Sequence, residues 1–188
     1  AKPVFESAKS SNMYAVDTFK AAAQEAAIQT ATDKHDSVGG VVLTTATGLP
    51  IGIGEPLYYK LDAILADAMM GINAAKAVEI GDGVASTHLK GSQNNDEITL
   101  NGFTSNHSGG MLGGISNGET IIVKTHFKPT PSIFQEQQTI TTHNEEVKCN
   151  LKGRHDPCVA IRGAVVCEAM MALTLADMTL LNMGKKMD

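Results

Sequence analysis

The chain has 188 residues, a length that suits one domain with a substantial core. Hydrophobic residues make up 43% and charged residues 19%, which excludes a disordered segment as the default interpretation. The formal net charge of −5 argues against a general nucleic-acid-binding protein, because that affinity depends mainly on neutralising phosphates. The odd number of cysteines, 3, does not fit a secreted disulfide framework and favours a reducing cytoplasm.

The sequence predicts neither a leader nor a membrane span. The opening segment AKPVFESAKSSN has no apolar core, so we expect no signal peptide. The longest apolar stretch, residues 159–183, contains Arg162, Glu168 and Asp177, whereas a spanning helix needs about 20 mostly apolar residues without such interruptions. We expect a buried core helix there. Because the chain begins with Ala rather than Met, we interpret it as a processed product or a piece of something longer.

The first half of the chain alternates between helix and strand patterns. Residues 14–34 are Ala-rich and free of Gly and Pro, which predicts a helix, and the Val- and Thr-rich residues 38–48 predict a strand. Pro56 is expected to open a second helix, which has an apolar stripe from Leu57 to Ile72. Residues 75–83 read as a strand that ends in a Gly-rich turn.

The second half of the chain is expected to begin with a long loop and to continue with strands. Residues 91–118 are rich in Gly and Asn, which predicts a long loop, and such a loop in a compact domain is usually functional or disordered. Strands are expected at 120–128 and 145–153, separated by a proline-stiffened extended segment. The expected fold is α+β, as one compact unit over residues 1–188.

The segment GRHDPC, residues 153–158, admits several kinds of site. A zinc site is disfavoured because the cysteines form no CxxC pair and no His stands at ligand spacing, so we expect no metal. Asp156 before Pro157 matches an N-cap followed by the first helical residue. A helix N-terminus also attracts anions, and Arg154 would lie on the same side of an extended segment as Asp156. A simple cap and an anion site both remain open.

Two further segments each have a functional and a structural interpretation; the structural one is favoured for residues 109–118 taken alone, and the two are equal for residues 128–132. GGMLGGISNG, residues 109–118, lacks the phosphate-loop pattern, but its backbone could approach a flat ligand closely; the alternative is a flexible surface loop. KPTPS, residues 128–132, offers a lysine and hydroxyls on a rigid backbone for an anion, or only a stiffened edge. The scattered histidines, His155 included, are weaker candidates.

Taken together, these segments resemble the chorismate synthase family. GEPLYYKLDAILADAMMGINAAKAVEIGDG, KGSQNNDEI, SNHSGGMLGGISNGE, FKPTPSI and GRHDPCVAIR occur in the family's order and at its spacings. The resemblance covers about Val38 to Met178 and corresponds to the C-terminal half of a family member. It implies antiparallel sheets covered by helices, an α/β sandwich with a long Gly-rich functional loop.

The resemblance implies a flavin-dependent lyase of aromatic amino acid biosynthesis in the cytoplasm. The family eliminates phosphate from 5-enolpyruvylshikimate 3-phosphate to give chorismate, needs reduced FMN without net oxidation, and usually forms a homotetramer. No nucleic acid or membrane partner is expected. By motif, Asp156 matches the aspartate proposed to handle the flavin N5 proton. The flavin-contacting positions match Asn73, Ala74, Gly113, Lys128, Pro129, Thr130, Pro131, Ser132 and Arg154.

The sequence also departs from the family pattern. Pro131 stands where many members have Ser, so one N–H and one hydroxyl are missing there. In the family, the N-terminal half supplies a GESHG-like stretch, two histidines that act as acids and arginines that bind the substrate. None of these has a counterpart in the sequence. We therefore expect the chain alone to be inactive. The rival interpretation is a non-catalytic flavin- or phosphate-binding module, or an assembly half that needs a partner chain.

Overall fold

The computed structural model describes residues 8–185. Residues 1–7, part of the segment in which we expect no signal peptide, lie outside the described residues, as do residues 186–188. The chain divides into two compact units: the first comprises residues 1–40 and 128–161, and the second comprises residues 41–127 and 162–188. Each unit is described by itself, and the single unit expected over 1–188 stays a prediction.

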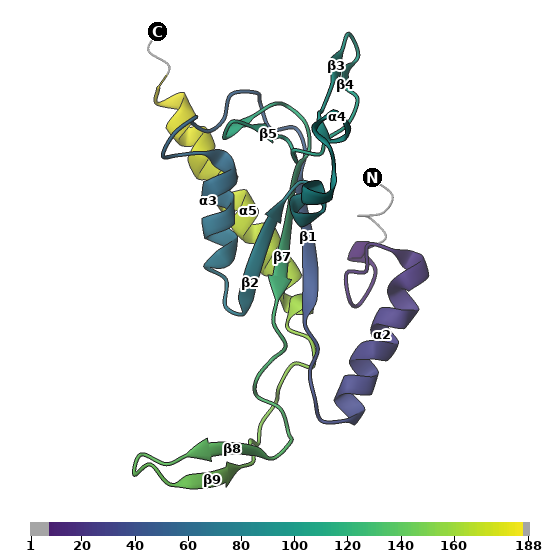
Figure 1. Cartoon of the computed structure of the whole chain (residues 1–188), viewed down its shortest axis with the longest axis vertical. Coiled ribbons are helices and arrows are strands. Elements are labelled where there is room, and N and C mark those ends of the chain that lie inside the picture. The colour runs from purple at the N-terminus through teal and green to yellow at the C-terminus, as the bar shows by residue number, and fades with distance from the viewer. Residues whose placement is uncertain (1–7, 186–188) are drawn as a thin grey trace. The chain divides into compact units, whose positions relative to one another are not determined.

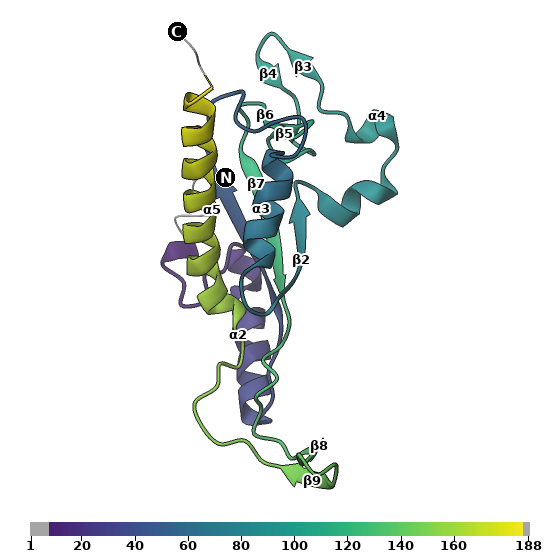
Figure 2. The same cartoon turned by 90° about the vertical axis from the view of Figure 1, so that its left-hand side faces the viewer.

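The second unit is built on a three-stranded sheet in the order β1–β7–β2, with β1 at Gly40–Ala46, β7 at Ile121–Phe127 and β2 at Ala75–Ile80. β2 and β7 are antiparallel, and Glu79 stands opposite Lys124. The helices α3 (Leu61–Met70) and α5 (Ala160–Met183) lie beside this sheet (Figures 1 and 2). The α+β class and the antiparallel pairing are confirmed.

The core of the second unit lies between the sheet and the two helices. β7 buries alternate residues, as expected for a strand with one face on the core, and Ile121, Val123 and Thr125 are fully buried. α3 contributes Leu61, Leu65 and Met69, each 0% exposed. These three residues follow the helical spacing that the sequence predicts.

The predicted start of α3 is wrong. The helix begins at Leu61 rather than at Pro56, and Leu57 is 64% exposed. Tyr58 has φ +58°, which is incompatible with a right-handed helix. The N–H of Glu55 instead donates to the carbonyl oxygen of Tyr59 at 3.0 Å, so a local turn occupies this stretch.

The predicted burial of α5 holds for one face only. Cys167, Met171 and Met178 are buried against the sheet side of the second unit. The opposite face, which we name the outer face of α5, consists of the exposed residues Val165, Ala169, Leu173, Ala176 and Leu180. Its length and a mean hydropathy of 1.7 over 18 residues would let α5 cross a membrane, although core helices of soluble proteins share this property.

Shortening a side chain is expected to have a large effect on the buried face of α5 and a small effect on its outer face. Met171→Ala is expected to lower the free energy of unfolding by about 3 kcal/mol, because it leaves a cavity in the core. Leu173→Ala, on the outer face and 67% exposed, is expected to change it by less than about 0.5 kcal/mol. Urea unfolding of both variants measures this. Equal losses would mean that the outer face is covered within the chain.

Residues 83–118 contain only short elements, as the Gly- and Asn-rich composition predicts for the part from 91 to 118. They are η1 (Gly83–His88), α4 (Gly91–Asn94), β3 (Ile98–Thr99), β4 (Gly102–Phe103), β5 (Met111–Leu112) and β6 (Ile115–Ser116). The loop is closed at its base. The N–H of Asp82 donates to the carbonyl oxygen of His107 at 2.9 Å, and the His107 Nδ1 lies 2.6 Å from the Asp82 Oδ2.

The first unit contains α2 (Thr18–Asp33) and the antiparallel hairpin of β8 (Gln137–Ile140) and β9 (Glu146–Cys149). α2 lies within the predicted helix, and Asp17 caps it by accepting hydrogen bonds from the N–H groups of Phe19 and Lys20. β9 falls within the predicted strand 145–153. We did not predict β8, because its polar sequence QQTI lacks strand patterning.

Candidate functional site

Three segments far apart in the sequence meet in the first unit. The segment after α2 contacts the KPTPS segment, because the Ser37 hydroxyl donates to the Thr130 carbonyl oxygen at 2.7 Å. The N–H of Phe134 donates to the His35 carbonyl oxygen at 3.2 Å. On the other side, the N–H of Val38 donates to the Pro157 carbonyl oxygen at 2.8 Å. Residues 35–38 therefore join KPTPS to GRHDPC.

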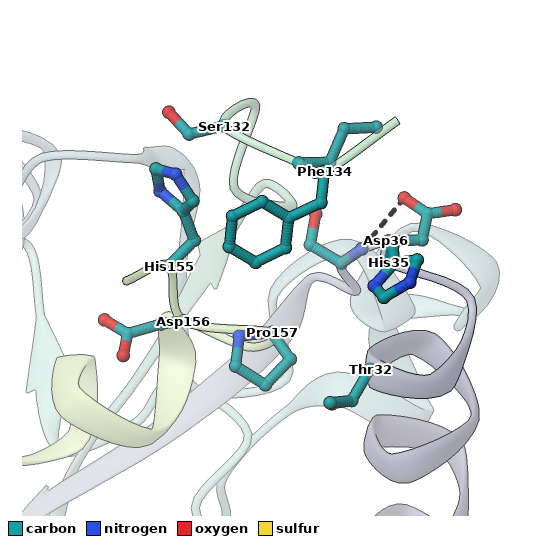
Figure 3. Close-up of a pocket in the computed structure, with 10 residues that line it drawn as sticks. Thr32, His35, Asp36, Ser132, Phe134, His155, Asp156 and Pro157 are labelled. Carbon is teal, nitrogen blue, oxygen red and sulfur yellow. Dashed lines mark hydrogen bonds between the residues drawn. The ribbon is translucent and has the colours of Figure 1, made fainter. Parts of the chain in front are cut away.

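A pocket lies at this junction (Figure 3). Its lining residues are Thr32, His35, Asp36, Ser37, Ser132, Ile133, Phe134, His155, Asp156 and Pro157. The Phe134 ring lies between the two imidazoles. Its centroid is 6.2 Å from that of His35, edge-on at 87°, and 5.1 Å from that of His155, tilted at 59°. These geometries are the favourable arrangements for aromatic pairs.

The structure brings two of the predicted site residues to this pocket. Ser132 and Asp156 both line it. The Thr130 hydroxyl is close by in the chain and is buried without a hydrogen-bond partner among the described residues. The exposed predicted residues of the first unit are Lys128, Pro129, Pro131 and Arg154. None of these four is among the lining residues.

The predicted N-cap at Asp156 is wrong. α5 begins at Ala160, so Pro157 is not its first residue. The reason is tertiary: the Pro157 carbonyl is bonded to Val38, and the Cys158 thiol lies 3.8 Å from the Gly39 carbonyl oxygen, which holds the chain extended there. Among the described residues, the pocket lining contains carboxylates but no Lys or Arg. The pocket itself therefore lacks the cations of an anion site.

Asn73, Ala74 and Gly113 belong to the second unit, and the structure does not bring them together there. Gly113 lies in the β5–β6 turn beside the start of α3, where the Leu61 N–H donates to the Gly114 carbonyl oxygen at 2.8 Å. Asn73 and Ala74 follow the other end of this helix, about 15 Å away for ten residues. Ala74 has φ +70°, a conformation that costs a non-glycine residue free energy.

The sequence interpretation missed His35, Asp36 and Phe134. No local motif marks them, because each reaches the pocket through a long-range contact: Ser37 and Thr130, which join the two segments, are 93 residues apart. A sequence signal existed only for GRHDPC and KPTPS. His155, which the sequence ranks low, is the ring in contact with Phe134.

A second polar cluster lies in the second unit, at the base of the loop. Burial of the Asp96 carboxylate by itself raises its pKa, but hydrogen bonds from the Ser105 hydroxyl and from the N–H groups of Ser108 and His107 outweigh this and lower the pKa to about 2. The hydrogen bond to Asp82 raises the pKa of His107. These groups fasten the loop.

Comparisons with known proteins identify the family. The family model described as chorismate synthase matches residues 2–180. The chain is 85% identical to the chorismate synthase of Sulfurovum sp. (strain NBC37-1), over 98% of this chain and 52% of that protein. It is 66% identical to that of Sulfurimonas denitrificans, over 97% of this chain and 51% of that protein.

A solved structure agrees with these relatives. A crystal structure of chorismate synthase is 32% identical and superposes with a TM-score of 0.77, covering 95% of this chain and 48% of that chain. The chain thus spans about half the length of the curated relatives that it matches. On sequence and fold alike, the chain belongs to the chorismate synthase family.

Proposed function

We propose that the protein to which this chain belongs is a chorismate synthase, a carbon–oxygen lyase that eliminates phosphate from 5-enolpyruvylshikimate 3-phosphate to give chorismate. The observation that carries the proposal is the 85% identity to a chorismate synthase over 98% of the chain. The meeting of KPTPS and GRHDPC around one pocket supports it, because these are two of the segments that carry the family resemblance.

We propose reduced FMN as the cofactor. Each unit has one feature that suits a flavin: in the first unit the Thr130 hydroxyl is a buried polar group without a hydrogen-bond partner among the described residues, and in the second unit no described atom beyond the chain neighbours of Gly113 lies within 4 Å of its Cβ position. The first offers a hydrogen bond and the second leaves room for close approach of a flat ring. When bound, reduced FMN supplies electron density transiently as the phosphate leaves.

The predicted site residues of the first unit differ in the chemical groups that they offer to a ligand. Lys128 and Arg154 are exposed cations suited to a phosphate, and Arg can contact it with two parallel hydrogen bonds. Thr130 and Ser132 offer hydroxyls, whereas Pro129 and Pro131 keep the backbone of this segment extended. Asp156 is proposed to exchange a proton with the flavin N5. Asn73, Ala74 and Gly113 are proposed as flavin contacts of the second unit.

We further propose that this chain alone does not turn over substrate. The supporting observation is the outer face of α5, an apolar helix face that is exposed in this chain, as a face that packs on a further part of the protein would be. The working enzyme is proposed to be a cytoplasmic homotetramer. The carboxylates and hydroxyls of the pocket would then act only beside substrate-binding groups from outside this chain.

The test is phosphate release from 5-enolpyruvylshikimate 3-phosphate with reduced FMN under anaerobic conditions. We expect no release above background from the 188-residue chain, and turnover from a protein in which the same chain is joined to the N-terminal half of the Sulfurovum relative. In that joined protein, Asp156→Asn is expected to lower kcat by at least about 100-fold, as loss of a proton-transfer group does. His143→Ala, an exposed site in the same unit, serves as the control.

The rival function makes a different prediction in the same assay. A non-catalytic flavin- or phosphate-binding module would quench FMN fluorescence on titration, yet give no phosphate release even when joined to the N-terminal half. Turnover by the joined protein therefore rejects the module. Turnover by the chain alone would reject the proposal that it is incomplete.

A further inference from the structure

The dipeptide Asn–Gly occurs at two places in the chain, Asn101–Gly102 and Asn117–Gly118. Both places belong to the second unit. In an Asn–Gly pair the backbone nitrogen of the glycine can attack the side-chain amide of the asparagine, because glycine has no side chain to shield that nitrogen. The local chemistry of the two pairs is the same, so a difference in their reactivity must come from the fold.

The first pair lies in the turn of the β3–β4 hairpin, which projects beyond the sheet of the second unit (Figures 1 and 2). Thr99 pairs with Gly102, so that Leu100 and Asn101 are the two residues between the paired positions. Asn101 and Gly102 are both exposed, and so is Leu100 beside them. A hairpin whose strands have two residues each holds its turn weakly, so this turn opens readily.

The two groups that would react have room to meet in this turn. The backbone N–H of Asn101 donates to the Thr99 hydroxyl at 3.1 Å, but the Asn101 side-chain amide makes no hydrogen bond within residues 8–185. Gly102 has φ +102°, and no described atom beyond its chain neighbours lies within 4 Å of its Cβ position. Neither the amide nor the space around the glycine is therefore restrained by packing.

The second pair is held on both sides. The Asn117 Oδ1 accepts a hydrogen bond from the Glu119 N–H at 3.0 Å, and the Asn117 Nδ2 is buried. The backbone N–H of Asn117 donates to the Gly110 carbonyl oxygen at 3.0 Å. A nitrogen that leaves as ammonia must be reached by water, and the buried Nδ2 is not. Asn117 can therefore react only after this part of the chain has opened.

We propose that Asn101 is a site of spontaneous deamidation in the folded protein, with water as the second reactant. The Gly102 nitrogen loses its proton to the solvent and bonds to the Asn101 Cγ, and the bond from Cγ to Nδ2 breaks with release of ammonia. Water then cleaves one of the two ring bonds from a carbonyl carbon to the Gly102 nitrogen in the resulting succinimide. The product at position 101 is aspartate or isoaspartate, no redox partner is needed, and the chain gains a carboxylate. This inference does not depend on the proposed function.

The effect of the modification is expected to stay within the hairpin. Below the two strands, the N–H of Thr104 donates to the Glu97 carbonyl oxygen at 2.9 Å, and the Ser105 hydroxyl donates to the Asp96 Oδ1 at 2.7 Å. Isoaspartate lengthens the backbone of the turn but removes neither of these bonds. We therefore expect the isoaspartate form, separated by ion exchange, to unfold at the same urea midpoint as the unmodified chain.

The test compares the two asparagines within one molecule. The 188-residue chain is incubated near neutral pH, in buffer and in guanidinium chloride, and mass spectrometry of its proteolytic peptides gives the rate of conversion of each amide to an acid. In denaturant, Asn101 and Asn117 are expected to convert at similar rates. In buffer, Asn101 is expected to stay within about threefold of its denatured rate, because turns that fray open at little cost. Asn117 is expected to be at least about tenfold slower than Asn101, since an opening free energy of about 1.4 kcal/mol already lowers a rate tenfold.

Two variants show that the Gly102 nitrogen is the attacking group. Gly102→Ala shields this nitrogen and is expected to slow conversion at position 101 by at least about tenfold, while the rate at Asn117 stays the same. Asn101→Gln, which would need a larger ring, is expected to show no conversion at position 101 and keeps the glycine if Gly102→Ala does not fold. The inference would be overturned if Asn117 converted as fast as Asn101 in the folded chain, or if Gly102→Ala left the rate at Asn101 unchanged. Protection of Asn101 in the protein joined to the N-terminal half of the Sulfurovum relative would overturn it as well.

Discussion

An alanine at Gly81 is expected to lower the free energy of unfolding by more than about 4 kcal/mol, or to prevent folding of the second unit. Gly81 has φ +59°, and a Cβ there would stand 2.6 Å from the backbone nitrogen of Gly109 and 2.8 Å from the carbonyl carbon of Ser108. These are main-chain atoms at the closed base of the loop, so no side-chain rotation can relieve the overlap. Urea unfolding followed by circular dichroism measures the loss.

Gly113 provides a matched control for this substitution. It also has φ +59°, but among the described residues beyond its two chain neighbours no atom lies within 4 Å of its Cβ position. Gly113→Ala therefore incurs only the cost of the left-handed backbone, about 1 kcal/mol. The difference between the two variants isolates the contact of Gly81 with residues 107–109. Equal losses would show that backbone conformation alone matters and that the loop base is not closely packed.

Removing the Asp96 carboxylate is expected to cost about 3 kcal/mol at pH 7, because partly buried hydrogen-bond donors lose a charged acceptor. The Ser105 hydroxyl and the His107 N–H each lie 2.7 Å from the Asp96 Oδ1, and the Ser108 N–H lies 2.9 Å from the Oδ2. Asp96→Ala removes this acceptor from all three donors. Glu97→Ala, an exposed carboxylate next to it, is the control and should change stability by less than about 0.5 kcal/mol.

The same carboxylate predicts how stability depends on pH. The folded pKa of Asp96 is lowered from 3.8 to about 2, so its contribution to stability is fully present above the unfolded pKa and is lost as the pH falls from 3.8 toward 2. The difference in unfolding free energy between wild type and Asp96→Asn should shrink over this range. A difference that stays constant from pH 7 to pH 2.5 would contradict the proposed stabilisation of the loop by the Asp96 carboxylate.

The stabilisation by His107 depends on pH in the opposite direction to that by Asp96. Its pKa is raised above 6.5 by the hydrogen bond to Asp82, so its contribution is present below pH 6.5 and is lost as the pH rises through the folded pKa. Asp82 and Asp96 are the charged groups that face it. The loop base is therefore expected to be most stable between the acid and the alkaline transitions.

Some elements could be predicted from the sequence because their signals are local. The helix α2 follows from its Ala-rich composition, and β7 from the alternation of apolar residues between Ile121 and Phe127. The stripe of α3 follows from the spacing of Leu61, Leu65 and Met69. The start of α3 could not be predicted, because the left-handed conformation of Tyr58 has no signature in its own residue type.

The sequence by itself determined the family, since its motifs keep their residues in order, and it identified GRHDPC and KPTPS as candidate site segments. Only the tertiary structure decided how these residues are arranged. The bond between Val38 and Pro157 moved the start of α5 to Ala160 and so removed the predicted cap. The contact between Phe134 and His155 brought a residue that the sequence ranked low to the pocket. Both contacts join residues more than 20 positions apart, and such pairings leave no periodic or motif pattern in the chain from which they could be read.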